Sequence, residues 1–238
     1  MAHSAELLNN EALFESSYTP EIIVSVDGVK TAPSAATLTL YDPSGTAIVT
    51  TRACAINSTT KKITAVFTGG DGTGEIDEKT ENWRLLLAYE IDVDSVAVTY
   101  QANFLFDVCR VILVNPVTDD DLKELHPGIV GEIWSTQTTY TAQIEKAFAD
   151  IKRKLKERGR RPSMLIDGTQ IKDLIICHAL ELIFFDFAKD ATDIWWNRYL
   201  KRAEQFAADF ENLHIVYDSD ESGTIDEVVH FGNVNLSR

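Results

Sequence analysis

The chain has 238 residues, of which 45% are hydrophobic and 25% charged, and its formal net charge is -15. This composition is typical of a globular protein with a packed core, and the acid excess disfavours a protein that coats nucleic acid. The most apolar stretch, residues 174–187, contains charged residues and is shorter than the roughly 20 apolar residues of a membrane span. The acidic N-terminus has no basic segment followed by an apolar run, so no signal peptide is predicted.

Short strand-like runs separated by turn signals occupy residues 22–114. Polar and apolar residues alternate in 37–41, as in a strand with one buried face, and "DPSG" at 42–45 suits a type I turn that closes a hairpin. Strands at a spacing of roughly 8–12 residues predict an immunoglobulin-like β-sandwich. We assign it to residues 20–116, after an N-terminal arm at 1–19.

The second half of the chain has a helical pattern, which we assign to an antiparallel helical bundle at residues 117–212. Thr118 is a natural N-cap followed by three aspartates, so a helix is expected to begin at residue 119 and to break at Pro127. A second short helix would then carry Ile129, Ile133 and Trp134.

Three longer helices follow, each with apolar residues at helical spacing. They are predicted at residues 140–155, 169–189 and 191–211, and short links between them favour antiparallel packing. The last segment, 213–238, contains two strand-like runs around "SDESG", which predicts a β-hairpin projecting from the bundle. The predicted fold class is therefore α+β, with an immunoglobulin-like β-sandwich, an antiparallel helical bundle and a terminal β-hairpin arm.

Residues 218–229, "DSDESGTIDEVV", match an EF-hand calcium loop except at the last position. Position 12 should supply a bidentate glutamate but is Val229, and the flanking segments look like strands rather than helices. A hairpin turn would use the same residue types, because aspartate, serine and glycine suit tight turns. We therefore expect a turn and no cofactor, with Ca²⁺ as the metal to test. The candidate ligands are Asp218, Asp220, Ser222, Thr224 and Asp226.

A basic run at residues 152–161 holds seven basic residues and one acidic residue. Such a run can neutralise phosphates, or it can be a solvated helix end whose cations favour the helix dipole. The run has no interleaved aromatic residues on which bases could stack, so the function it favours is non-specific contact with DNA or with an acidic partner. The residues expected to make it are Lys152, Arg153, Lys156, Arg158, Arg160 and Arg161.

Trp195 and Trp196 are adjacent, so one helix face cannot bury both, and we predict that Trp196 contacts a partner. His178 is expected to be a core or interface histidine. The chain has no HExxH, CxxC, Walker loop or Ser/His/Asp order, so we predict that it is not an enzyme.

Four segments of the second half stand out together, namely "VTDDDLKELHPGI", "TAQIEKAFADIKRKLKERGRRP", "IKDLIICHALELIFFDFA" and "YDSDESGTIDE". They resemble the tailed-bacteriophage head-tail connector proteins, also called adaptor or head-completion proteins. The resemblance covers about residues 117–238 and implies a homo-oligomeric ring, usually a dodecamer, beneath the portal, with a lumen for the genome. It also implies that 213–238 is an arm that docks onto the portal or a downstream neck or tail protein. The β-rich half departs from the smallest members, which are helical alone.

We therefore hypothesise that the chain is a structural protein of the virion neck, made in the host cytoplasm. Its predicted partners are further copies of itself and the portal, and no membrane is involved. Besides Trp196, the residues predicted to contact partners are Ile215, Tyr217, Val228, Phe231, Val234 and Leu236. One alternative is a calcium-responsive ligand-binding module that uses the 218–226 loop. Another is a different phage neck or tail-completion protein.

Overall fold

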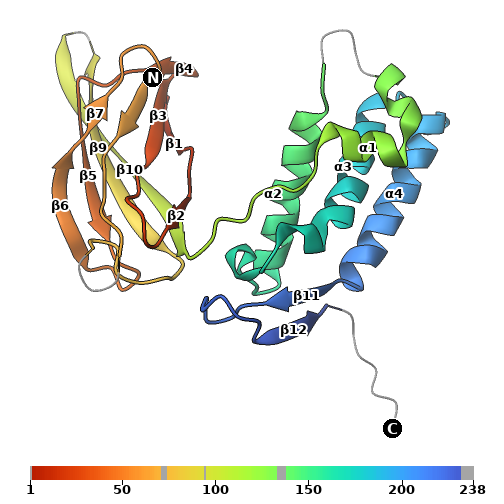
Figure 1. The fold of residues 1–238 in the computed structure, drawn as a ribbon. Helices are drawn as coiled ribbons and strands as arrows, with labels where there is room; N and C mark the ends of the chain where they lie inside the picture. Colours follow the sequence, from red (N-terminus) through yellow and green to blue (C-terminus); the bar gives the residue numbers. More distant parts are fainter. Residues whose placement is uncertain (1, 71–73, 94, 133–137, 232–238) are drawn as a thin grey trace. The chain divides into compact units, whose positions relative to one another are not determined.

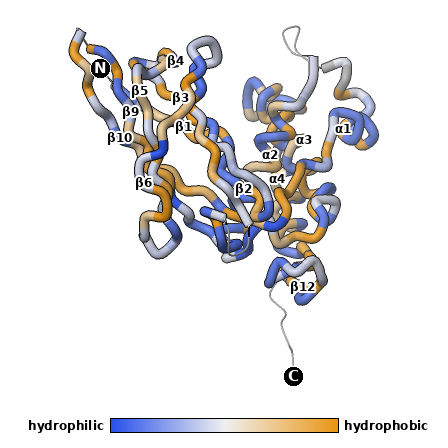
Figure 2. The backbone as a smooth tube through the Cα atoms, turned by 60° about the vertical axis from the view of Figure 1, so that its left-hand side comes forward, coloured by the Kyte–Doolittle hydropathy of each residue, from blue (hydrophilic) through white to orange (hydrophobic). Residues whose placement is uncertain are grey.

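The computed structural model has a mixed α+β fold, with strands in the N-terminal half and helices mainly in the C-terminal half (Figure 1). The chain divides into two compact units, Met1–Ile112 and Leu113–Arg238, and each has its own hydrophobic cluster. Figure 2 shows hydrophobic residues along the backbone of both units. Within the part of the chain that is described, no helix is long and apolar enough to cross a membrane. The described residues are 2–70, 74–93, 95–132 and 138–231.

The N-terminal unit contains two five-stranded sheets. In the first, the order is β1-β3-β8-β7 with β4 paired to β3, and every pair is antiparallel. Its strands are β1 (His3–Leu7), β3 (Glu21–Val26), β4 (Val29–Thr31), β7 (Ala55–Ile56) and β8 (Lys62–Thr64).

The second sheet has the order β2-β10-β9-β5-β6, in which only the β2–β10 pair is parallel. Alternate residues of β9, from Trp83 to Ile91, are buried, as the two-residue period of a strand requires. Apolar side chains from both sheets meet in one cluster, which includes Ile22 of the first sheet and Leu85 of the second. The strands are β2 (Glu11–Leu13), β5 (Ala35–Tyr41), β6 (Ala47–Ala53), β9 (Trp83–Val93) and β10 (Val96–Cys109).

The segment expected to form an N-terminal arm is instead part of both sheets. Strand β1 pairs with β3 from His3↔Val26 to Leu7↔Ile22, and β2 lies parallel to β10. β2 has only three residues and β1 contains only two apolar residues, Ala5 and Leu7, so neither strand has a clear alternation signal in the sequence. The hairpin predicted around residues 42–45 is confirmed, because the Gly45 N–H donates to the Asp42 carbonyl at 3.0 Å between β5 and β6.

The C-terminal unit begins with α1, which starts at Asp119 as predicted. The Asp121 carboxylate accepts hydrogen bonds from the backbone N–H and the hydroxyl of Thr118, at 2.8 and 2.9 Å. The chain turns into a 3-10 helix at Pro127, and the predicted helical residues Ile133 and Trp134 lie outside the described residues. The helical segments are α1 (Asp119–Leu125), η1 (Pro127–Glu132), α2 (Thr141–Glu157), η2 (Pro162–Met164), η3 (Gly168–Ile171), α3 (Lys172–Phe187) and α4 (Ile194–Glu211).

Helix α3 packs against α1, α2 and α4, and nine of its residues are buried around most of its circumference. It begins at Lys172 rather than at residue 169, because the chain first forms η3, where Asp167 accepts the Thr169 N–H. Similarly, α4 begins after Asp193, whose carboxylate accepts the Trp195 N–H at 3.0 Å. The Asp193 cap therefore sets the start of α4, whereas Asp167 caps η3 and α3 follows η3 directly.

The terminal hairpin of β11 (His214–Tyr217) and β12 (Glu227–His230) is part of the helical unit and not a projecting arm. Ile215, Tyr217 and Val229 are 0%, 1% and 6% exposed and belong to the helical core. The Gln170 side chain accepts from the Val216 N–H at 2.6 Å and donates to its carbonyl at 3.3 Å, which fixes β11 to η3. Alternation along β11 places the apolar residues on one face, and that face is covered.

Candidate functional site

The segment 218–226, which we call the acidic turn, closes the β11–β12 hairpin. The Asp218 carboxylate accepts the backbone N–H groups of Ser222 at 2.7 Å and Gly223 at 2.6 Å, and the Asp226 N–H donates to the Tyr217 carbonyl at 3.0 Å. The backbone of Gly223 has a φ of 98°, which glycine adopts without strain. Strands flank this turn on both sides, so it lacks the helix–loop–helix context of an EF-hand.

The acidic turn still brings three carboxylates together. Oxygens of Asp218, Asp220 and Asp226 lie within 4.8 Å of one another, with Asp218 buried and the other two exposed. The Ser222 and Thr224 hydroxyls are hydrogen-bonded to each other at 2.8 Å. Hydrogen bonds from Ser222 hold the pKa of the exposed Asp220 below its usual value. A divalent cation bound by these aspartates would have no bidentate carboxylate ligand, because Val229 is buried in the core and Glu227 is paired with Arg160.

Most of the basic run is used inside the C-terminal unit. Arg160 pairs with Glu227 at 3.1 Å, and Arg161 pairs with the buried Glu221 at 3.0 Å. These pairs attach the segment after α2 to the start of β12 and to the acidic turn.

The other arginines of the run also have carboxylate partners. Arg158 pairs with Glu211, and Arg153 with Asp150 at 3.1 Å. The Lys152 ammonium lies 5.3 Å from the centre of the Phe148 ring, and Lys156 is exposed. Four of the six residues expected to contact DNA or an acidic partner are therefore held by carboxylates of the same unit.

A second group of cations surrounds a pocket of about 290 Å³ beside α4. The Arg198 guanidinium lies 4.5 Å from the centre of the Trp195 ring, and Arg202 donates to the Gln205 amide oxygen at 2.8 Å. Within the described residues, neither Arg198 nor Lys201 pairs with a carboxylate. The residues that line this cationic pocket are His126, Phe184, Arg198, Lys201, Arg202 and Gln205.

Sequence reasoning missed the cationic pocket because the 152–161 run has the higher local density of charge. The signal was present in the spacing of Arg198, Lys201 and Arg202, which places all three on neighbouring positions of one helix face. His126 and Phe184 come from other elements, and no local pattern connects them to α4.

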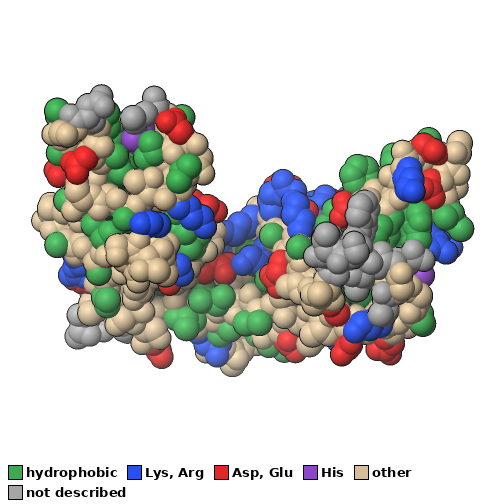
Figure 3. Space-filling view, turned by 90° about the horizontal axis from the view of Figure 1, so that it is seen from above, with side chains coloured by type: hydrophobic (Ala, Val, Ile, Leu, Met, Phe, Trp, Pro, Cys, Tyr) green, Lys and Arg blue, Asp and Glu red, His purple; other side chains and the backbone are tan. Residues whose placement is uncertain are grey.

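Aromatic side chains also remain at the surface where α3 and α4 meet. Phe185 is 52% exposed, and its ring centre lies 6.5 Å from that of Trp196 and 5.2 Å from that of Tyr199. Leu200, four residues after Trp196 on α4, is 48% exposed. We call Phe185, Trp196, Tyr199 and Leu200 the aromatic patch, in which Phe185 and Leu200 are exposed and Trp196 and Tyr199 are partly exposed. Hydrophobic side chains are visible on the surface of the helical unit in Figure 3.

The two adjacent tryptophans divide as expected. Trp195 packs on the core with Phe184 and Phe187, at ring-centre distances of 5.6 and 5.2 Å, whereas Trp196 belongs to the aromatic patch. Trp196 is partly exposed and therefore accessible to a partner, and its contact with a partner stays a prediction.

The residues of the terminal segment predicted to contact partners have different positions. Ile215 and Tyr217 are corrected to core residues, because their side chains are buried beneath the hairpin. Val228 is 55% exposed on the opposite face, and Phe231 is partly buried against the core. Val234 and Leu236 lie outside the described residues.

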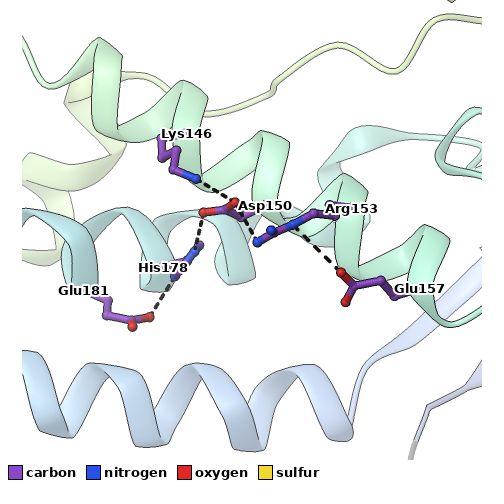
Figure 4. Close-up of polar contacts among 6 residues, drawn as sticks. All are labelled: Lys146, Asp150, Arg153, Glu157, His178 and Glu181. Atoms are coloured by element: carbon purple, nitrogen blue, oxygen red, sulfur yellow. Dashed lines mark hydrogen bonds and ion pairs between the residues drawn. The ribbon is translucent and has the colours of Figure 1, made fainter. Parts of the chain in front are cut away.

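Figure 4 shows a polar network between α2 and α3, in which Asp150 and His178 are buried. Asp150 on α2 accepts hydrogen bonds from Lys146 at 2.8 Å and Arg153 at 3.1 Å, and its other oxygen lies 3.4 Å from Nε2 of His178. Nδ1 of His178 lies 2.7 Å from a Glu181 oxygen. Burial acts to raise the pKa of Asp150, but hydrogen bonds from Lys146 and His178 outweigh it and keep this pKa below its usual value.

The His178 ring also stacks on Phe206 of α4, at a centre-to-centre distance of 4.3 Å. Both ring nitrogens face carboxylates, and within the described residues no hydroxyl or thiol is hydrogen-bonded to the ring. The network therefore lacks a nucleophile that the imidazole could activate. The contacts of His178 with Asp150 on α2 and Phe206 on α4 instead connect α3 to both neighbouring helices.

Comparison with known proteins gives no family for this chain. The sequence matches no protein-family model and no curated protein. Among solved structures, a DUF4785 family protein from Legionella pneumophila subsp. pneumophila strain Philadelphia 1 is similar over 44% of this chain and 28% of that chain. The identity is 13% and the TM-score is 0.32, a similarity that indicates neither a shared fold nor a shared function.

Proposed function

We propose that the protein is a head-tail connector of a tailed bacteriophage, a structural protein that forms a ring between the portal and the tail and lets DNA pass. In this proposal the N-terminal unit is an immunoglobulin-like β-sandwich and the C-terminal unit an antiparallel helical bundle that builds the ring. The chain is made in the host cytoplasm and becomes part of the virion neck. It acts without a cofactor and without catalysis. The resemblance of residues 117–238 to connector proteins supports this assignment.

The aromatic patch is the structural observation that best supports an assembling protein. Exposed, contiguous apolar groups are characteristic of interaction surfaces, and tryptophan and tyrosine often supply most of the binding free energy of an interface. Trp196 and Tyr199 lie side by side, with ring centres 5.1 Å apart, so a partner could cover both rings in one contact. A ring subunit needs such a surface in every copy.

Electron microscopy of the full chain, alone and mixed with the portal ring encoded in the same genome, tests the proposal. We expect rings of the chain or additional ring density on one face of the portal. Trp196→Ala should weaken this association about 30-fold or more, as expected for an interface residue worth at least about 2 kcal/mol. Leu105→Ala, at a 59% exposed position in the N-terminal unit, is the control for loss of exposed apolar surface. Bare portals beside free monomers would exclude the connector assignment.

A further inference from the structure

We propose that the cationic pocket on α4 binds the acidic turn of a second copy of this chain. The inference rests on the proposed ring, and it names the polar contact between neighbouring subunits. Asp220 and Asp226 of one copy would lie against Arg198 and Lys201 of the next.

The pocket has the chemistry of a carboxylate site. Arginine and lysine supply up to three positive charges, the Gln205 side chain can donate a further hydrogen bond, and none of the six lining residues is acidic. The net charge of the chain is -15, and within the described residues no carboxylate pairs with Arg198 or Lys201, so a carboxylate from another copy would add a favourable contact here. The volume of about 290 Å³ is sufficient for more than one carboxylate group.

The acidic turn has the complementary chemistry. Asp220 and Asp226 are exposed, and together with Asp218 they concentrate three carboxylates within 4.8 Å. Like charges at this separation repel, and attraction to a nearby group of cations would offset that repulsion. In the described part of the chain, neither Asp220 nor Asp226 forms an ion pair with lysine or arginine.

The two surfaces are too far apart to meet within one unit. The Arg161–Glu221 pair holds the acidic turn beside η2, which follows α2, whereas the pocket lies between the first half of α4, the last turn of α3 and His126. In Figure 1, α4 runs from the end of α3 down to β11, and β11 then leads toward the end of α2. Roughly 15 Å of helix separates Lys201 from Glu211, before the hairpin begins. Each copy can therefore donate its turn to one neighbour and receive a turn from another.

A contact between two different surfaces of the same chain is heterologous, so it propagates from copy to copy and closes into a ring when the rotation permits. Exposed ion pairs contribute little affinity but penalise wrong alignments strongly. We infer that the aromatic patch supplies most of the affinity, while the pocket and the turn set the direction and the register of neighbouring copies.

Charge reversal of each surface, separately and together, tests this contact. The pocket variant is Arg198→Glu with Lys201→Glu, and the turn variant is Asp220→Lys with Asp226→Lys. Each should raise the concentration for half-assembly about 100-fold or more at physiological salt, because like charges then face each other. A 1:1 mixture of the two variants should assemble again, since each pocket then meets a turn of opposite charge. Sedimentation measures the assembly, and circular dichroism verifies that each variant is folded.

The matched control is Lys30→Glu with Lys61→Glu, which makes the same change in net charge within the N-terminal unit and should leave assembly unchanged. If a pocket variant misfolds, Arg198→Gln with Lys201→Gln replaces it, with an expected rise of about tenfold. Assembly of the reversed variants at wild-type concentrations would overturn the inference and leave the ring proposal intact. Loss of assembly without recovery in the mixture would also overturn it. Pocket-dependent assembly without portal binding would retain this contact and exclude the connector function.

DNA phosphate is the other anion that the pocket chemistry admits. If the pocket variant loses binding to a double-stranded oligonucleotide while its assembly is unchanged, the pocket binds DNA. The proposed contact between two copies of the chain is then wrong.

Discussion

Replacement of Ile215 by alanine tests whether the terminal hairpin is part of the helical core. Ile215 lies on β11, and its side chain is fully buried among residues of the helical unit. Its truncation removes about three buried methylene equivalents, worth about 0.8 kcal/mol each, and leaves a cavity as well. We expect a loss of about 3 kcal/mol in the free energy of unfolding, which lowers Tm by roughly 10 °C for a unit of this size.

Differential scanning calorimetry can measure this effect separately for the two units, if each has its own core and its own transition. Only the transition of the helical unit should move, so the N-terminal unit serves as an internal reference. Val228→Ala is the matched control, because Val228 lies on the other strand of the same hairpin with 55% of its side chain exposed, and its truncation should cost less than about 0.5 kcal/mol. Equal shifts for both variants would refute a hairpin integrated in the core and favour the projecting arm.

Two further predictions concern charge. The pKa of Asp150 is lowered in the folded state, so its carboxylate stabilises the fold above the unfolded pKa of about 4, and this contribution is lost as the pH falls through the lower, folded pKa. Asp150→Asn should therefore cost about 1–3 kcal/mol at pH 7 and progressively less below about pH 4, and a pH-independent difference in thermal unfolding would contradict the assignment. About 1 mM calcium should raise Tm by less than about 1 °C, because Asp218 is bonded to backbone N–H groups and no bidentate ligand is present. A larger rise that Asp220→Asn abolishes would revive the calcium-responsive module.

The elements with a strong local signal were predictable from the sequence. Apolar spacing located α2, α3 and α4, and Thr118 located the start of α1, because helix periodicity and capping depend on residues close in sequence. The short strands β1 and β2 carry no such signal, since their pairing with β3 and β10 is set by tertiary contacts. The alternation of "LHIVYD" correctly predicted β11 but not the surface that covers its apolar face. Ile215 and Tyr217 were therefore assigned to a partner although the chain itself buries them.

The same limit explains why the more conspicuous basic run was the weaker candidate for a binding surface. The partners of Arg158 and Arg160 are 53 and 67 residues away along the chain, so no local pattern shows that these cations are already neutralised. They are neutralised because the end of α4 and the hairpin return to the end of α2. No described carboxylate pairs with Arg198 or Lys201 on the first half of α4. A cation that folding leaves without a counter-charge is available to a partner, whereas the four arginines of the denser run already have carboxylate partners. The distribution of ion pairs in the folded unit, rather than the density of charge in the sequence, therefore identifies α4 as the surface to mutate first.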